Sequence, residues 1–155
     1  MPATAPTMTQ AVQLIYAGIP TQDPPLPASL WFEEVPPDLP QLPIVQFKHQ
    51  GEPPPGKAYT TNLAGGTFAP NHLIGKFQLV IWHTSIPQLE DWARAIMTAF
   101  NFYVQNNWPL DSPQVGSSIR TNYVIAPTGL VAQGTTTPVR TLTLDYQVFI
   151  GNPAA

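Results

Sequence analysis

Proline is the residue that most restricts how this chain folds, because its ring fixes φ and removes a backbone hydrogen-bond donor. The chain has 155 residues, of which 20 are proline. That is about 13%, against an average of about 5%. Thirteen of the prolines fall within residues 1–55. We therefore expect residues 20–43 to form an extended arm on a surface, docked through Leu30, Trp31 and Phe32. The alternative is a partly disordered arm.

Regular elements are expected on both sides of this arm. Residues 7–18 favour a short helix, which Gly18 and Pro20 end. Residues 42–50 alternate like a strand. Residues 51–73, which begin with GEPPPGK, then predict one long loop.

The stretch GKFQLVIWHTSIPQLEDWARAIMTAF, residues 75–100, changes its period halfway. Residues 76–84 predict a strand that is apolar on both faces, and such a strand is covered on both sides or by a neighbouring subunit. A helix follows, with Ser85 as its cap and Gln88 completing a capping box. Glu90 and Asp91 are expected near its N-terminus, where the helix dipole favours acids. Its apolar stripe consists of Leu89, Trp92, Ala93, Ile96 and Phe100.

Residues 118–127 and 139–150 predict a closing pair of strands joined by TGLVAQGTTTP. The predicted fold is α+β: a four-stranded, mostly antiparallel sheet with one main helix packed on it, a short N-terminal helix and a proline-rich extended arm. One domain is expected over residues 1–155. Residues 1–43 form the helix and arm, and residues 44–155 form the core with its long loop.

The composition argues against several classes of function. Only 10% of the residues are charged and the net charge is −3, so a tight grip on nucleic-acid phosphates is not expected. The chain has no cysteine, which excludes disulfides, zinc–thiolate sites and cysteine catalysis. No signal peptide is expected, since the first ten residues lack a basic segment and a long apolar run. No apolar window approaches the roughly 18 residues of a membrane span.

Candidate chemical groups gather around the end of the predicted strand, where His83, Thr84 and Ser85 precede Glu90 and Asp91. Ser85 is better explained as a helix cap, and no nucleophile elbow is present. The histidines His49, His72 and His83 are not spaced like metal ligands on one element. No catalytic residue, metal or cofactor is therefore expected.

The order of the elements resembles that of the tail terminator and head–tail connector family of long-tailed bacteriophages. The resemblance covers most of the chain. It rests on AVQLIYAGIP before the arm, LPIVQFKHQ after it, residues 75–100, and the closing segments SSIRTNYVIAP and VRTLTLDYQVFIG. The chain departs from the family in its heavy proline content and in the long segment from Gly51 to Leu73.

This resemblance implies a structural protein without catalytic activity, built into the virion and assembled in the host cytoplasm. It implies a homo-oligomeric ring, commonly a hexamer, with portal or adaptor proteins above it and tail-tube or sheath proteins below. Genomic DNA would pass through its channel without sequence-specific binding. The residues expected at subunit or partner interfaces are Trp31, Phe32, Lys57, Tyr59, Phe68, Trp82, Trp108, Arg120 and Arg140.

Two other functions are compatible with the sequence. The first is a small cellular α+β module that binds a peptide or a sugar through Trp31, Trp108 and the long loops. The second is an enzyme that uses His83 with Glu90 or Asp91.

Overall fold

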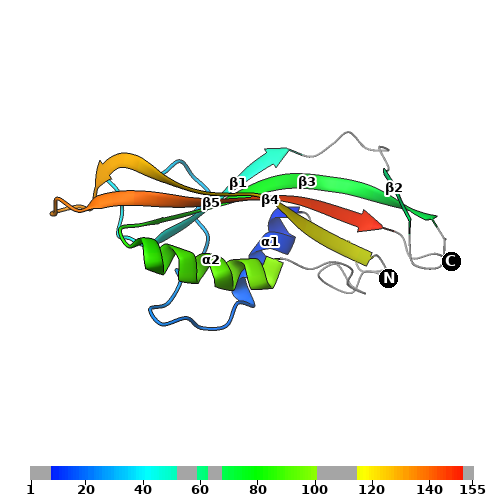
Figure 1. Ribbon diagram of the computed structural model, residues 1–155, viewed down its shortest axis with the longest axis horizontal. Coiled ribbons are helices and arrows are strands. Elements are labelled where there is room, and N and C mark those ends of the chain that lie inside the picture. Colours follow the sequence, from blue (N-terminus) through cyan, green and yellow to red (C-terminus); the bar gives the residue numbers. More distant parts are fainter. Residues whose placement is uncertain (1–7, 52–58, 63–67, 101–114, 152–155) are drawn as a thin grey trace.

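A computed structural model describes residues 8–51, 59–62, 68–100 and 115–151, with side chains for residues 8–51, 75–100 and 120–148. An antiparallel sheet carries the longer helix along one face (Figure 1). The predicted α+β class and the main helix on the sheet are confirmed. The elements are α1 Met8–Ala17, β1 Ile44–Gly51, β2 Tyr59–Asn62, β3 Phe68–His83, α2 Ile86–Phe100, β4 Val115–Val131 and β5 Pro138–Gly151.

The strand order is β1-β3-β5-β4, and each neighbouring pair is antiparallel. These are the four predicted strands. A fifth, β2, pairs with the first residues of β3. The prediction of one loop over residues 51–73 was therefore wrong for residues 59–62 and 68–73. Pro70 lies within β3. A strand tolerates proline at a position where the backbone nitrogen does not have to donate a hydrogen bond to a neighbouring strand.

One core fills the space between the sheet and the two helices. Phe77 lies at its centre: its ring centroid is 5.3 Å from that of Tyr146, 5.7 Å from that of Phe100 and 5.8 Å from that of Phe47. The predicted apolar stripe of α2 is buried against these side chains, and α1 adds Met8, Ala11, Val12 and Tyr16. Most of the buried apolar side chains among the described residues therefore lie on the helix side of the sheet.

The start of α2 differs in part from the prediction. The Ser85 hydroxyl accepts a hydrogen bond from the Gln88 backbone N–H at 3.4 Å, so Ser85 does cap the helix. The helix begins at Ile86 and has no acid in its first turn. Glu90 and Asp91 thus lie one turn too far along for a strong dipole effect, which falls off within the first turn. Asp91 instead pairs with Arg94 at 3.6 Å on the surface.

The β4–β5 hairpin is longer than predicted. The two strands remain paired as far as Val131 and Pro138. The turn between them is closed by a hydrogen bond from the Ala132 N–H to the Thr137 carbonyl at 2.9 Å. Gly134 in this turn has φ of 76°, a left-handed conformation that glycine adopts without a steric penalty.

The proline-rich arm is bound to the body of the protein. The Trp92 indole N–H of α2 donates to the Pro24 carbonyl at 2.9 Å. The Tyr16 hydroxyl of α1 donates to the Pro27 carbonyl at 2.7 Å, and its burial raises the pKa of Tyr16. Leu30 joins the helix-side core. The predicted extended arm on a surface is confirmed.

Candidate interface surfaces

The arm reaches the free edge of β1 at Trp31. The Trp31 N–H donates to the Val45 carbonyl at 2.8 Å, and the Phe47 N–H donates to the Trp31 carbonyl at 2.9 Å. Trp31 thereby forms a parallel bridge with Gln46. Bridged residues share a face of the sheet, so Trp31 lies on the face away from α2, while Leu30 lies on the helix side.

Gln46 joins the arm, β1 and β3 on this second face. Its side chain is 2% exposed. Its amide nitrogen donates to the Glu33 carbonyl at 3.0 Å, and its amide oxygen accepts from the Trp82 indole N–H at 3.2 Å. Trp82 was predicted as an interface residue, and here its polar atom is bound within its own chain. Sequence reasoning missed Gln46, because a lone glutamine in an apolar strand usually marks a solvent-facing position.

The same contacts explain the apolar second face of β3. Val80 lies beside Gln46 in the sheet register, and Leu39, Ile44, Val80 and Val139 are all buried although they lie outside the helix-side core. This burial arises within a single chain. The two-faced apolar strand consequently does not require a neighbouring subunit.

A groove lies on the outer side of β1, beside the arm. It has a volume of about 450 Å³. Phe32, predicted as an interface residue, lines this groove with 47% of its surface exposed. Its ring packs against Phe47 at 5.6 Å between centroids. Glu33, Glu34 and Lys48 also line the groove, so its carboxylates outnumber its lysines.

The opposite edge of the sheet is β4. In the described part of the chain its one neighbouring strand is β5. Three large apolar side chains of β4 are exposed: Tyr123 at 36%, Val124 at 42% and Val131 at 51%. Their exposure cannot be read from the sequence, because SSIRTNYVIAP looks like an ordinary half-buried strand.

Arg120, a predicted interface residue, lies on this β4 edge and is exposed. Its guanidinium lies 5.5 Å from the centre of the Tyr123 ring and 3.1 Å from the Met97 sulfur. Burial and the nearby Glu90 carboxylate raise the pKa of Tyr123, while Arg120 and Arg94 oppose the shift. Within the described residues the one ion pair is Arg94–Asp91, so Arg120 has no carboxylate partner there.

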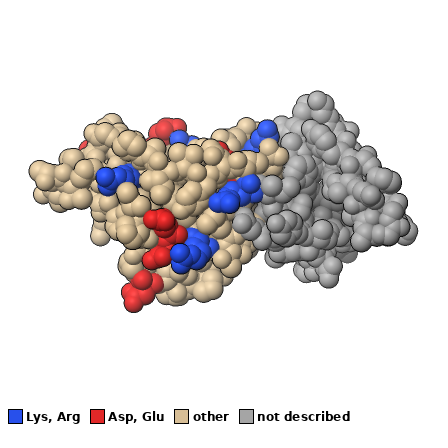
Figure 2. All heavy atoms as spheres, viewed as in Figure 1, with Lys and Arg blue, Asp and Glu red and all other residues tan. Residues whose placement is uncertain are grey.

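The remaining predicted interface residues are scattered. Arg140 is half-buried on β5, beside His83 and Pro127 in the register. Tyr59 and Phe68 lie on the β2–β3 pair. Lys57 and Trp108 lie outside the described residues. Basic and acidic side chains intermingle on the face seen in Figure 2, without a continuous basic surface there.

The polar residues that suggested catalysis do not converge. The His83 ring packs 5.0 Å from the Trp92 ring, and burial lowers the pKa of His83. Asp91 is engaged with Arg94. His49 is paired with Phe77, six positions from His83 on β3, which puts these two histidines about 20 Å apart. In the described part of the chain no three His, Asp or Glu side chains group as metal ligands.

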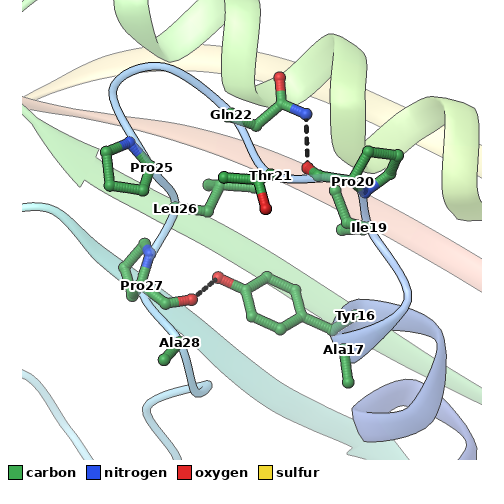
Figure 3. Close-up of a pocket in the computed structure, with 10 residues that line it drawn as sticks. All are labelled: Tyr16, Ala17, Ile19, Pro20, Thr21, Gln22, Pro25, Leu26, Pro27 and Ala28. Carbon is green, nitrogen blue, oxygen red and sulfur yellow. Dashed lines mark hydrogen bonds between the residues drawn. The ribbon is translucent and has the colours of Figure 1, made fainter.

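A small cavity of about 220 Å³ lies inside the loop between α1 and the arm (Figure 3). It is lined by Tyr16, by prolines and aliphatic side chains, and by Thr21 and Gln22, and the Tyr16 hydroxyl points to the Pro27 carbonyl. Binding sites for small molecules commonly have about 300–1,000 Å³ and several convergent polar groups. The cavity therefore offers little for ligand recognition.

No helix in the described residues is both long enough and apolar enough to cross a membrane. The chain was also compared with known proteins: no family model matches it, and no curated protein matches its sequence.

Proposed function

We propose that this protein is a structural component of a bacteriophage virion that forms a ring at the head–tail junction. The ring, commonly of six copies, would cap the tail tube and join it to the connector, and DNA would pass through its channel. The proposal starts from the resemblance in the order of elements. It is supported by the α+β fold, whose sheet and main helix have the arrangement that the resemblance implies.

The observation that carries the proposal is the β4 edge, which is paired on one side only within the described residues. An exposed edge strand with large apolar side chains invites pairing, and monomeric proteins usually protect such an edge. Here β1 is protected by the arm at Trp31, whereas β4 exposes Tyr123, Val124 and Val131. An edge of this kind is expected where a neighbouring subunit covers it.

The charge of the chain is compatible with a channel for DNA. The net charge is −3, and the described cations lie on separate strands and on α2. A channel dense in lysine and arginine would hold phosphates tightly. A mildly acidic ring would let DNA slide.

The decisive experiment is mass spectrometry of purified phage particles from the host that carries the gene. The proposal expects this protein among the virion proteins at a few copies per particle, and ring-shaped particles of the purified protein in negative stain. A gene position beside portal and tape-measure genes would add support. Absence from virions, together with a strictly monomeric protein by mass photometry, would refute it.

The peptide- or sugar-binding alternative gains no support from Trp31, because the indole nitrogen of that residue is buried and cannot reach a ligand at the surface. A monomer that retains a defined glycan or peptide on an array would favour it over the ring.

A further inference from the structure

The two edges of the sheet differ in charge and in what covers them. The β1 edge carries the bridged arm and the groove with Glu33 and Glu34. The β4 edge carries Arg120 and the exposed Tyr123 and Val124. Neither glutamate has a cation within ion-pair distance in the described part of the chain, and Arg120 likewise lacks an acid there. Within the described residues, each edge therefore presents a charge that has no ion-pair partner.

We propose that the β4 edge of one copy binds the groove beside β1 of the next copy. Arg120 of the first copy would pair with Glu33 or Glu34 of the second, and Tyr123, which shares the helix-side face of β4 with Arg120, would pack near Phe32. The contact is heterologous, because two different surfaces of the same chain meet. Repetition of such a contact produces a ring when the rotation closes. The inference rests on the proposed ring and names the surfaces that build it.

Strand direction favours the same pairing. The four strands alternate in direction in the order β1-β3-β5-β4, so β1 and β4 run in opposite directions. A second copy placed edge to edge in the same orientation would bring its β1 antiparallel to β4 of the first. The arm at Trp31 runs parallel to β1, so it too would lie antiparallel to the incoming β4. Antiparallel pairs form with the more favourable hydrogen-bond geometry.

The natural absence of cysteine permits a clean crosslinking test. Phe32→Cys is combined in turn with Tyr123→Cys and with Val124→Cys, and each double variant is oxidised at high protein concentration. Within one chain the two edges are separated by three strand spacings, about 14 Å. A disulfide needs Cα atoms within about 7 Å. Any disulfide in the double variants therefore joins two copies, and repetition gives a ladder on a non-reducing gel.

We expect a ladder from at least one double variant, and only single links from an equimolar mixture of the matching single variants. Thr21→Cys with Tyr123→Cys is the matched control, and it should give no ladder because Thr21 lies on the arm outside the groove. Arg120→Glu added to the reactive pair should reduce the ladder about tenfold, since like charges then meet. Further replacement of Glu33 and Glu34 by lysine should restore it.

The absence of a ladder from both double variants would overturn the inference. So would efficient dimer formation by Tyr123→Cys or Val124→Cys alone, because that result would show β4 paired with β4 across a two-fold axis. A ladder that is insensitive to the charge reversals would exclude the assigned ion pair. These results are independent of virion proteomics: a protein found in virions without the ladder refutes this contact alone, and a ladder from a protein missing from virions refutes the proposed location alone.

Discussion

Replacement of Gln46 by methionine tests how much one buried amide adds to the backbone hydrogen bonds of Trp31 that hold the arm to the sheet. Methionine has a similar length and an apolar side chain, so the volume on the second face of the sheet is largely retained. The substitution removes the partner of the Trp82 indole N–H and of the Glu33 carbonyl. A typical intramolecular hydrogen bond contributes about 0.5–1.5 kcal/mol net. We therefore expect Gln46→Met to lower the free energy of unfolding by about 2 kcal/mol.

A double-mutant cycle isolates the part due to Trp82. Trp82→Phe removes the indole donor but keeps an aromatic ring. In that background Gln46→Met should cost only about 1 kcal/mol, because the bond to Glu33 alone is lost. The expected coupling free energy between the two positions is thus about 1 kcal/mol. The matched control is Gln50→Met on the exposed end of β1, which should change stability by less than about 0.5 kcal/mol.

Urea unfolding followed by fluorescence and by far-ultraviolet circular dichroism supplies the free energies, and agreement of the two probes tests two-state behaviour. Digestion with a glutamate-specific protease supplies a local readout, because Glu33 and Glu34 lie in the arm beside the Gln46 contact. Gln46→Met should accelerate cleavage at these residues more than Gln50→Met does. Equal costs of Gln46→Met in both backgrounds, with unchanged cleavage of the arm, would refute the reasoning.

Three further perturbations probe other parts of the structure. Phe77→Ala should cost about 3–5 kcal/mol in urea unfolding, because Phe77 is at the centre of the aromatic core; a loss no larger than that of Leu14→Ala, at an exposed position, would contradict the assigned core. Tyr16→Phe should cost about 1 kcal/mol, because the Pro27 carbonyl loses its donor, and unchanged stability would show that water replaces the hydroxyl. Burial lowers the pKa of His83 from its ordinary 6.5. As the pH falls, the unfolded chain therefore binds the proton at this histidine before the folded chain does. The stability that neutral His83 contributes above pH 6.5 is lost as the pH falls through its folded pKa. The loss of stability between about pH 7.5 and about pH 5.5 should therefore be smaller in His83→Gln than in the unmodified protein; equal losses would assign the pH dependence to other groups.

The elements that could be predicted from the sequence are those whose burial is decided by local periodicity. Phe77, Leu79 and Ile81 alternate on β3, and the stripe of α2 recurs every three or four residues, so one core face follows directly. The short strand β2 and the first residues of β3 could not be found this way. These two segments pair with each other, and no periodicity within either segment reveals that pairing. Pro70 also resembles a loop residue.

The interface surfaces were predictable only in part. Tryptophan between prolines indicates a docking residue, and Trp31 does dock, but onto β1 of its own chain. The sequence could not distinguish an intramolecular partner from a neighbouring copy. The open β4 edge depends on the strand order and on which strand is last in the sheet. Strand order is a property of long-range pairing, so alternation within SSIRTNYVIAP does not reveal it.

The hydrogen bonds that hold the arm have a consequence for which residues can change among homologues of this protein. Three of its attachments end on main-chain carbonyl oxygens, those of Pro24, Pro27 and Glu33. Every residue type offers such an oxygen, so the identity of the acceptor residue matters little. The donors are Tyr16, Gln46 and Trp92 of the folded body. Homologues should therefore retain the donors while the arm drifts in sequence, and the outward side chains of the arm are left free to adapt to a changing neighbour.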